Sequence, residues 1–542
     1  MGQGMRILRM STTLGVGIVL ILSASVADAA AQARVLHFPQ GRSFGEVYLH
    51  DADSLSFSSE SFLGWKRLGE GRGDVPIPEG KAVRLDATKE ALVCDPPFGG
   101  LGPNDIQMLC FRRCGDVNDA QLRCVARLAG LQLLDLGSTQ VLGAGLKHLA
   151  ALKRLAWLDL SFTNVGDNEL AALAELPALE HLSLRHASVG DPGMVHVGKI
   201  KTLRSLSLDR TSVTDEGLVH VGRLSGLVRL SLWENHITDE GLAHLAGLTR
   251  LQDLGLVRTR ISGPGLIHLK GMGELKHLRL GMSEVGNAGL AHLPALESLE
   301  DLELPTETKI SDGGLVHLSK LPSLKKLYVI SGSITGKGLE MLARLPRLEE
   351  LDTGGPGVND AAVAVLAGFP SLKTLWIQMS PLTDAGVEQL GRLKSLSRLE
   401  LANVPATAEG LRALAGLTDL SLSNLKLGPD GLSALTELKS LERLRLYRVA
   451  IRDEDLACVA QLPRLKSFGA DSRAITDQGL AHLGKLKSLE SLSLSRAGIT
   501  DEGLKHLEGL TSLTYLYVGG TKVTQEGLRR LALRLPALEW SL

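Results

Sequence analysis

Histidines recur at one position along much of this 542-residue chain, and their chemistry needs an explanation first. Nine of the 15 share that position: His148, His196, His220, His244, His268, His292, His317, His482 and His506. A column of imidazole groups suggests metal binding or proton transfer. Each histidine, however, lies on the flank of a predicted outer helix and faces the next helix, about 10 Å away. Because one metal ion cannot bridge that gap, we expect a packing ladder and no bound metal or other cofactor.

Four cysteines lie close together ahead of the regular part of the chain, namely Cys94, Cys110, Cys114 and Cys124. In an exported protein they allow two disulfides in three connectivities, or they remain plain thiols. Their spacing fits no zinc motif and no histidine accompanies them, which makes a metal site the weaker alternative. Cys458 stands alone in a predicted helix, where a thiol is typically a small buried apolar group.

Eight of the ten tryptophans and tyrosines occupy strand positions that are expected to face the concave side of a curved sheet. These residues are Trp157, Trp233, Tyr328, Trp376, Tyr447, Tyr515, Tyr517 and Trp540. Exposed Trp and Tyr are enriched at binding hot spots, so we predict a ligand-binding surface here. The alternative is that the rings pack on one another and stiffen the sheet. Arg445 joins the predicted surface, because Arg443, Arg445 and Arg448 surround Tyr447 in a basic patch.

The elements that would position these side chains come from a repeat of about 24 residues. In Leu203–Gly226, LxxLxL predicts a short strand, and Thr211 is expected to bond backbone groups of the turn that follows. Thr214 or Asp215 then caps a helix with an apolar stripe. The glycine at the start of that helix recurs at Gly241, Gly265, Gly289, Gly479 and Gly503, which indicates a close approach to a neighbouring group. One repeat cannot bury its own apolar side chains, so repeats must stack.

Counting a degenerate first repeat at 106–130, about 18 repeats fill residues 106–542. Their strands would form a parallel sheet with an inner arc of roughly 80 Å, at about 4.8 Å per strand. An arc of that length suits a protein or a polymer better than a metabolite. The register shifts near Thr306–Lys309, at Gly354–Gly357 and in the short repeat 396–416, which we interpret as drift that a solenoid tolerates.

The pattern LxxLxLxxT/NxhTDxGLxxLxxL resembles the leucine-rich repeat, and its ITDxGL half is most similar to repeats of ribonuclease-inhibitor-like and F-box-associated proteins. The resemblance covers about four-fifths of the chain. It implies an α/β horseshoe with a parallel sheet on the concave face and helices on the convex face. Thr replaces the usual Asn at many turns, most repeats lack cysteine, and no F-box is evident upstream.

The start of the chain differs from the repeats. Residues 1–29 combine Arg6 and Arg9, an apolar run from Leu14 to Val26 and an A-x-A site, which predicts a secretory signal; a retained anchor is the alternative. Residues 30–105 are expected to form a β-rich capping module, with two strands in Val75–Ala87. The module would cover the open edge of the sheet.

These features predict an exported, periplasmic, cell-surface or secreted binding protein that is not an enzyme. Its partner would be a protein or glycan held on the concave face. The formal net charge of −1 gives no indication of nucleic-acid binding, no membrane span is expected beyond the signal, and we expect a monomer. The alternative is an intracellular F-box-type adaptor, which requires that residues 1–29 are not a signal. The sequence does not identify the ligand, because repeat scaffolds host unrelated partners.

Overall fold

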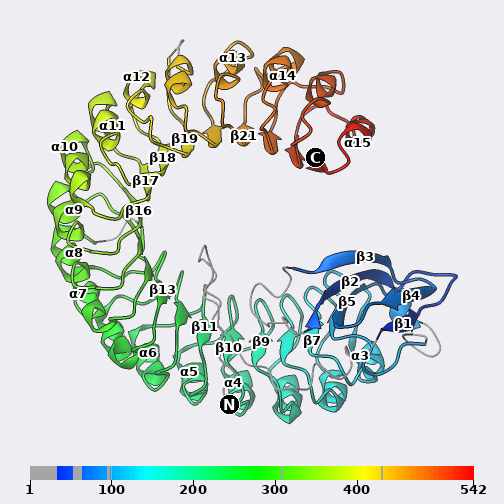
Figure 1. Ribbon diagram of the computed structural model, residues 1–542. Helices are drawn as coiled ribbons and strands as arrows, with labels where there is room; N and C mark the ends of the chain where they lie inside the picture. Colours follow the sequence, from blue (N-terminus) through cyan, green and yellow to red (C-terminus); the bar gives the residue numbers. More distant parts are fainter. Residues whose placement is uncertain (1–32, 53–63, 94–97, 99, 307–308, 429–430) are drawn as a thin grey trace, which may run out of the picture. The chain divides into compact units, whose positions relative to one another are not determined.

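The computed structural model describes residues 33–52, 64–93, 98, 100–306, 309–428 and 431–542. The predicted signal at 1–29 and Cys94 lie outside these ranges. The chain divides into two compact units, residues 1–207 and 208–542. Figure 1 shows that within each unit the repeat helices cover one side of the sheet, leaving its other face open.

Unit 1 begins with antiparallel strands and continues into parallel ones. Strand β5 pairs antiparallel with β2 and parallel with β6, so the N-terminal module and the first repeats share one sheet. Strands β1 and β4 form a separate antiparallel pair. The elements of unit 1 are β1 (Arg34–His37), β2 (Gly45–Asp51), β3 (Lys66–Glu70), β4 (Asp74–Ile77), β5 (Lys81–Ala87), α2 (Glu90–Val93), β6 (Met108–Cys110), α3 (Asp119–Val125), β7 (Leu133–Asp135), η2 (Leu146–Ala151), β8 (Trp157–Asp159), η3 (Asn168–Glu175), β9 (His181–Ser183), α4 (Asp191–Val197) and β10 (Ser205–Ser207).

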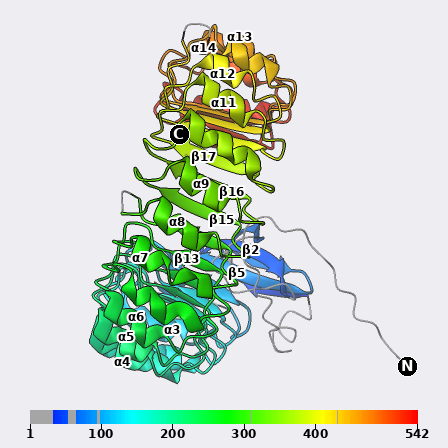
Figure 2. The same ribbon diagram turned by 90° about the vertical axis from the view of Figure 1, so that its left-hand side faces the viewer.

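Unit 2 consists of repeats, and its strands β11 to β24 pair in parallel in chain order. Figure 2 shows β15, β16 and β17 in this order, with α8 and α9 beside them. The elements are α5 (Asp215–Val221), β11 (Arg229–Ser231), α6 (Asp239–Leu245), β12 (Asp253–Gly255), η4 (Pro264–Gly271), β13 (His277–Arg279), α7 (Asn287–Leu290), η5 (Leu293–Ala295), β14 (Asp301–Glu303), α8 (Asp312–Leu318), β15 (Lys326–Ile330), α9 (Gly336–Leu342), β16 (Glu350–Gly354), α10 (Asp360–Val363), η6 (Ala364–Gly368), β17 (Thr374–Gln378), α11 (Asp384–Leu390), β18 (Arg398–Ala402), α12 (Ala408–Leu411), β19 (Asp419–Ser423), η7 (Ser433–Glu437), β20 (Arg443–Tyr447), α13 (Leu456–Val459), β21 (Ser467–Ala470), α14 (Asp477–Leu483), β22 (Ser491–Leu494), η8 (Gly503–Leu507), β23 (Tyr515–Tyr517), α15 (Gln525–Arg534) and β24 (Glu539–Ser541).

The core of a repeat is built from its leucines, as the stacking argument predicts. In the repeat that starts at Leu227, the strand residues Leu230 and Leu232 and the helix residues Leu242 and Leu245 are all buried. Each such side chain contributes roughly 1.5–3 kcal/mol when it is fully buried. Alternate strand positions point away from this core, so the third and fifth residues of a repeat lie on the open face.

Many neighbouring repeats of unit 2 are joined through an aspartate at or just before the start of the outer helix. Asp215 accepts hydrogen bonds from the backbone N–H of Thr238 (2.9 Å) and from its hydroxyl (2.5 Å), both in the next repeat. The same pair of bonds occurs at Asp312–Thr335, Asp360–Thr383, Asp384–Thr407, Asp453–Thr476, Asp477–Thr500 and Asp501–Thr524. We call these contacts the Asp–Thr ladder.

The ladder explains the recurrent helix glycine. A Cβ atom placed on Gly241 would overlap the carboxylate of Asp215, and one on Gly503 would overlap that of Asp477. The predicted close approach is therefore confirmed. The neighbouring group is a ladder aspartate at Gly241, Gly479 and Gly503, the backbone of Asp239 at Gly265 and the backbone of Gly263 at Gly289. Thr214 acts as the predicted helix cap, since its side chain accepts a hydrogen bond from the N–H of Glu216. The Thr211 hydroxyl bonds the carbonyl of Leu208, also as predicted.

Candidate functional site

The predicted aromatic residues are all at least partly exposed. Tyr447 and Tyr515 are exposed, with 43% and 42% of their surface accessible. The others, namely Trp157, Trp233, Tyr328, Trp376, Tyr517 and Trp540, are half-buried. The alternative of ring–ring packing holds for one pair, because the ring centroids of Tyr328 and Trp376 lie 6.1 Å apart at an interplanar angle of 32°.

The other predicted aromatics stand apart from this pair. Trp233 lies near a cation, since the guanidinium carbon of Arg210 is 5.7 Å from its ring centroid. Trp157, on β8, belongs to unit 1. Phe162 stacks on His186 with the ring centroids 4.6 Å apart. Tyr328 and Trp376 are thus two members of the predicted surface that the fold brings together from different repeats.

Acidic side chains alternate with these two rings at the fifth position of successive repeats. Five adjacent strands, β14 to β18, place Glu303, Tyr328, Asp352, Trp376 and Glu400 in register across the open face. We call these five residues the acid–aromatic row. Adjacent strands are about 4.8 Å apart, so the carboxylates recur at roughly 10 Å with a ring between each pair.

The carboxylates of the row have no ion-pair partner among the described residues. Nearby cations are engaged elsewhere: Lys326 Nζ lies 2.8 Å from Glu350 and Lys373 Nζ lies 2.9 Å from Glu349. Asp352 instead accepts a hydrogen bond from the amide of Gln378, at 3.1 Å. The row therefore presents negative charge that the protein leaves uncompensated.

Burial beside the rings changes the protonation of the row. Desolvation raises the pKa of Asp352 to about 6, although the Gln378 amide opposes the shift. Burial also raises the pKa of Glu303, despite the nearby charge of Arg279. The pKa of Tyr328 rises to about 12, chiefly through burial and then through the neighbouring carboxylates, so its phenol stays neutral. At neutral pH the carboxyl group of Asp352 is therefore mostly ionised, beside the neutral phenol of Tyr328.

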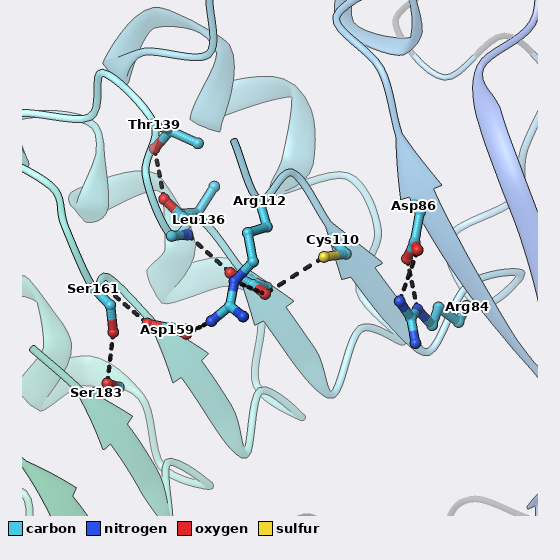
Figure 3. Close-up of polar contacts among 11 residues, drawn as sticks. Arg84, Asp86, Cys110, Arg112, Leu136, Thr139, Asp159, Ser161 and Ser183 are labelled. Atoms are coloured by element: carbon cyan, nitrogen blue, oxygen red, sulfur yellow. Dashed lines mark hydrogen bonds and ion pairs between the residues drawn. The ribbon is translucent and has the colours of Figure 1, made fainter. Parts of the chain in front are cut away.

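A second polar cluster, which the sequence analysis missed, lies on the open face of unit 1 (Figure 3). Asp135 and Asp159 stand in register on β7 and β8 and are both buried. The guanidinium of Arg112 bridges them, at 3.3 Å from Asp135 and 3.0 Å from Asp159. The shared LDL motif at 134–136 and 158–160, where most other repeats have another residue in place of Asp, was the available signal.

This cluster is built for structure rather than for nucleophilic chemistry. Asp135 and Asp159 each accept the backbone N–H two residues further on, from Gly137 and Ser161. Cys110 donates its thiol hydrogen to Asp135, with sulfur and oxygen 3.4 Å apart. Burial raises the pKa of Cys110 far above its usual range, so the thiol stays protonated and is a poor nucleophile.

The described cysteines carry free thiols. Cys110, Cys114 and Cys124 form no disulfide with one another, and Cys114 donates instead to the carbonyl of Ala87. Pairings among these three are therefore wrong for this structure, while the pairing of Cys94 falls outside the described residues. Cys458 is partly exposed rather than buried as predicted, because Leu456 and Val459 form the buried side of its helix, α13, and Cys458 lies off that side.

The predicted histidine column lies on the outer helices, and its members are partly or fully exposed. Within the described ranges, no three His, Cys, Asp or Glu side chains form a group that could hold a metal ion. A search for helices long and apolar enough to cross a membrane finds none in the same ranges.

Comparisons with known proteins agree with this architecture. Residues 187–416 match the family model described as leucine-rich repeat region, and residues 485–507 match the one described as leucine-rich repeat. Among solved structures, the TLR13–ssRNA13 complex superposes with a TM-score of 0.58 at 19% identity, over 85% of this chain. The fold is a leucine-rich repeat solenoid. The match spans 65% of the TLR13 chain.

Two bacterial leucine-rich repeat structures are also similar, though more distantly. An LRR protein of Leptospira interrogans matches 81% of this solenoid and 96% of its own chain, at 20% identity and a TM-score of 0.43. An internalin of Listeria monocytogenes matches 63% of this solenoid and 87% of its own chain, at 20% identity and a TM-score of 0.37. A search of curated proteins finds no match.

Proposed function

We propose that this solenoid is a non-enzymatic binding protein that holds a protein or glycan partner on the open face of unit 2. The observation that carries the proposal is the pair of rings from Tyr328 and Trp376, 6.1 Å apart, with the carboxylate of Asp352 between their strands. Partly exposed Trp and Tyr side chains supply large contact area at little entropic cost. Nucleophiles and general bases play no part in this role.

The charge of the acid–aromatic row indicates which partner surface fits. Glu303, Asp352 and Glu400 lack ion pairs within the described residues, and aromatic faces attract cations. Basic groups of a partner would therefore gain both Coulombic and cation–π stabilisation there. The same carboxylates repel phosphates, which argues against nucleic acid at this row, although the solved TLR13 complex contains a single-stranded RNA.

Comparative affinity capture tests the proposal. Wild-type protein, Tyr328→Ala/Trp376→Ala and the control Tyr48→Ala, which changes an aromatic residue outside the predicted surface, would each be exposed to the same extract, and the bound molecules identified. We expect the partner to be retained by the wild type and the control and lost by the double variant, with a Kd at least tenfold weaker. A partner that binds all three proteins equally would place the binding surface elsewhere.

Export is the second part of the proposal and rests on the sequence of residues 1–29. Mass spectrometry of the mature N-terminus checks it: cleavage after the A-x-A site at Ala27–Ala29 supports export. An intact N-terminus in a protein recovered from the cytoplasm would support the alternative of an intracellular adaptor.

A further inference from the structure

The strongest unassigned feature of the molecule is a group of three arginines on the open face of unit 2. Arg398 and Arg443 lie in register on either side of Asp419, on β18, β20 and β19 respectively. Their Nε atoms lie 2.9 Å and 2.8 Å from the same carboxylate oxygen of Asp419. Arg445 Nη1 is 3.8 Å from the other oxygen. One buried carboxylate thus gathers three guanidinium groups.

This arginine cluster, formed by Arg398, Arg443 and Arg445 around Asp419, carries excess positive charge. Three guanidinium groups face one carboxylate, which leaves a net charge of +2, and Asp419 is their sole ion-pair partner among the described residues. The side chains are about 40% exposed, whereas Asp419 is buried. A guanidinium has five N–H donors, so each arginine retains several for a ligand.

The surroundings keep the cluster open. The residues in register with Arg445 are Ser421 and Gly469, so no large side chain on either adjacent strand covers its guanidinium. Tyr447, two residues further along β20, exposes 43% of its surface. The nearest acid of the row, Glu400, is in register with Ser421 and hence two strands from Arg445.

We propose that the arginine cluster and Tyr447 form a second binding site, which takes an acidic peptide segment of a protein partner. Arginine binds carboxylates through paired N–H donors, and Arg and Tyr are both enriched at protein–protein hot spots. The Nε atoms of Arg398 and Arg443 contact one oxygen of Asp419, so the two guanidinium groups converge on one point. In an extended peptide, acidic residues two apart lie on the same face, about 7 Å from each other, so both can reach the cluster.

Fluorescence anisotropy with a labelled peptide tests this site independently of the acid–aromatic row. The probe carries glutamate at every second position; a lysine version, a sulfated oligosaccharide and an RNA oligonucleotide of matched charge serve as comparisons. We expect the glutamate peptide to bind wild type with an affinity that falls with added salt. We expect Arg443→Gln/Arg445→Gln to weaken binding at least tenfold.

Three further variants sharpen the test. Gly469→Glu places a carboxylate beside Arg445 and keeps every arginine; a Cβ there makes only ordinary contacts of 3.8 and 3.9 Å, so the variant should fold. It should weaken the peptide at least tenfold, whereas Gly469→Ser should not. Lys466→Gln/Arg496→Gln removes the same charge from cations paired with Glu442 and Asp471, and should change Kd less than threefold.

Several results would overturn the assignment. Unchanged affinity in Arg443→Gln/Arg445→Gln or in Gly469→Glu would show that the peptide binds elsewhere. Tighter binding of the oligosaccharide or the RNA, lost in the same variants, would replace the peptide with that ligand class. Equal losses in the control Lys466→Gln/Arg496→Gln would reduce the effect to net charge. Tyr328→Ala/Trp376→Ala should leave peptide binding intact, which separates this site from the proposed function.

Discussion

Removing one contact of the Asp–Thr ladder should loosen the array locally. Asp477 accepts two hydrogen bonds from Thr500 in the next repeat, from the N–H at 2.8 Å and the hydroxyl at 2.7 Å. Hydrogen bonds to charged groups contribute about 1.5–3 kcal/mol each, and partial exposure favours the lower end. Asp477→Ala should therefore cost about 2–3 kcal/mol and leave the Thr500 N–H without its partner.

The helix glycine supplies the second half of this test. A methyl group at Gly503 would overlap the Asp477 carboxylate, so Gly503→Ala alone should cost about 1–3 kcal/mol through overpacking. Once Asp477 is alanine, the two nearest clashing atoms are gone, and only Leu480 Cδ1, at 2.9 Å on a flexible side chain, still meets the methyl group. Asp477→Ala/Gly503→Ala should thus be only slightly less stable than Asp477→Ala, which gives a coupling free energy of about 1–2 kcal/mol.

Hydrogen exchange followed by mass spectrometry is the suitable assay, because a long solenoid need not unfold in one step. Amides of residues 499–507 should lose protection by roughly 30–100-fold in Asp477→Ala, since 1.4 kcal/mol corresponds to a factor of ten. Lys505→Ala, an exposed substitution on the same helix, serves as the control. Additive effects of Asp477→Ala and Gly503→Ala would refute the claim that the glycine exists to admit the aspartate.

Three further outcomes follow from the structure. The folded chain holds the Asp352 proton up to about pH 6 and the unfolded chain only to about pH 4, so the stability of the wild type should fall as the pH rises from 4 to 6. Asp352→Asn should remove this fall and be more stable than the wild type by about 2–3 kcal/mol above pH 6. Urea titrations at several pH values measure both effects. Asp501 behaves in the opposite sense, because hydrogen bonds from the Thr524 N–H, and then from the Thr524 hydroxyl and Arg530, lower its pKa. The stabilisation from Asp501 is present above pH 4 and is lost as the pH falls through the lowered pKa. Asp501→Asn should therefore reduce the loss of stability at acid pH. Met282 has a φ of +54° and is 64% exposed, so Met282→Gly should raise the stability by about 0.5–1 kcal/mol in thermal unfolding; a loss of stability would mean that the side chain makes contacts we have not recognised.

The leucine pattern was sufficient to predict the solenoid. Leu230, Leu232, Leu242 and Leu245 are buried because a 24-residue period leaves them no other partner, and this logic needs only one repeat and its copies. The glycine column was predicted to mark a close approach, again from periodicity. Properties that repeat in the sequence are thus recoverable from it.

Properties that depend on unlike residues in adjacent repeats were not recoverable. Asp215 was one of two candidate caps for its own helix, yet its carboxylate bonds Thr238 in the next repeat, which only the stacking geometry reveals. The bridge from Arg112 to Asp159 crosses 47 residues of sequence for the same reason. Tyr328 and Trp376 were predicted separately, and their convergence over β16 depends on side-chain directions that periodicity does not specify.

Left-handed backbone residues also escaped prediction. At the eighth position of many repeats the backbone φ is positive, between 51° and 59°, although the residue is not glycine. Arg258, Asn403 and Asn424 are examples. The backbone N–H of such a residue donates to the carbonyl of the seventh residue of the next repeat, as that of Asn424 does to Tyr447 at 2.9 Å. This bond uses backbone atoms alone, so the residue type carries no signal.

The Asp–Thr ladder has gaps, and the repeat steps at these gaps lack the pair of hydrogen bonds that joins other repeats of unit 2. Gly263 and Gly336 stand where an aspartate would otherwise link two repeats, and a Cβ at Gly263 would meet the backbone of Gly289 at 2.9 Å. Such steps are held by apolar packing and sheet hydrogen bonds, without the side-chain link. Under a stretching force applied to the ends of the unit, the contacts between repeats should therefore break at these positions before they break between the repeats on either side.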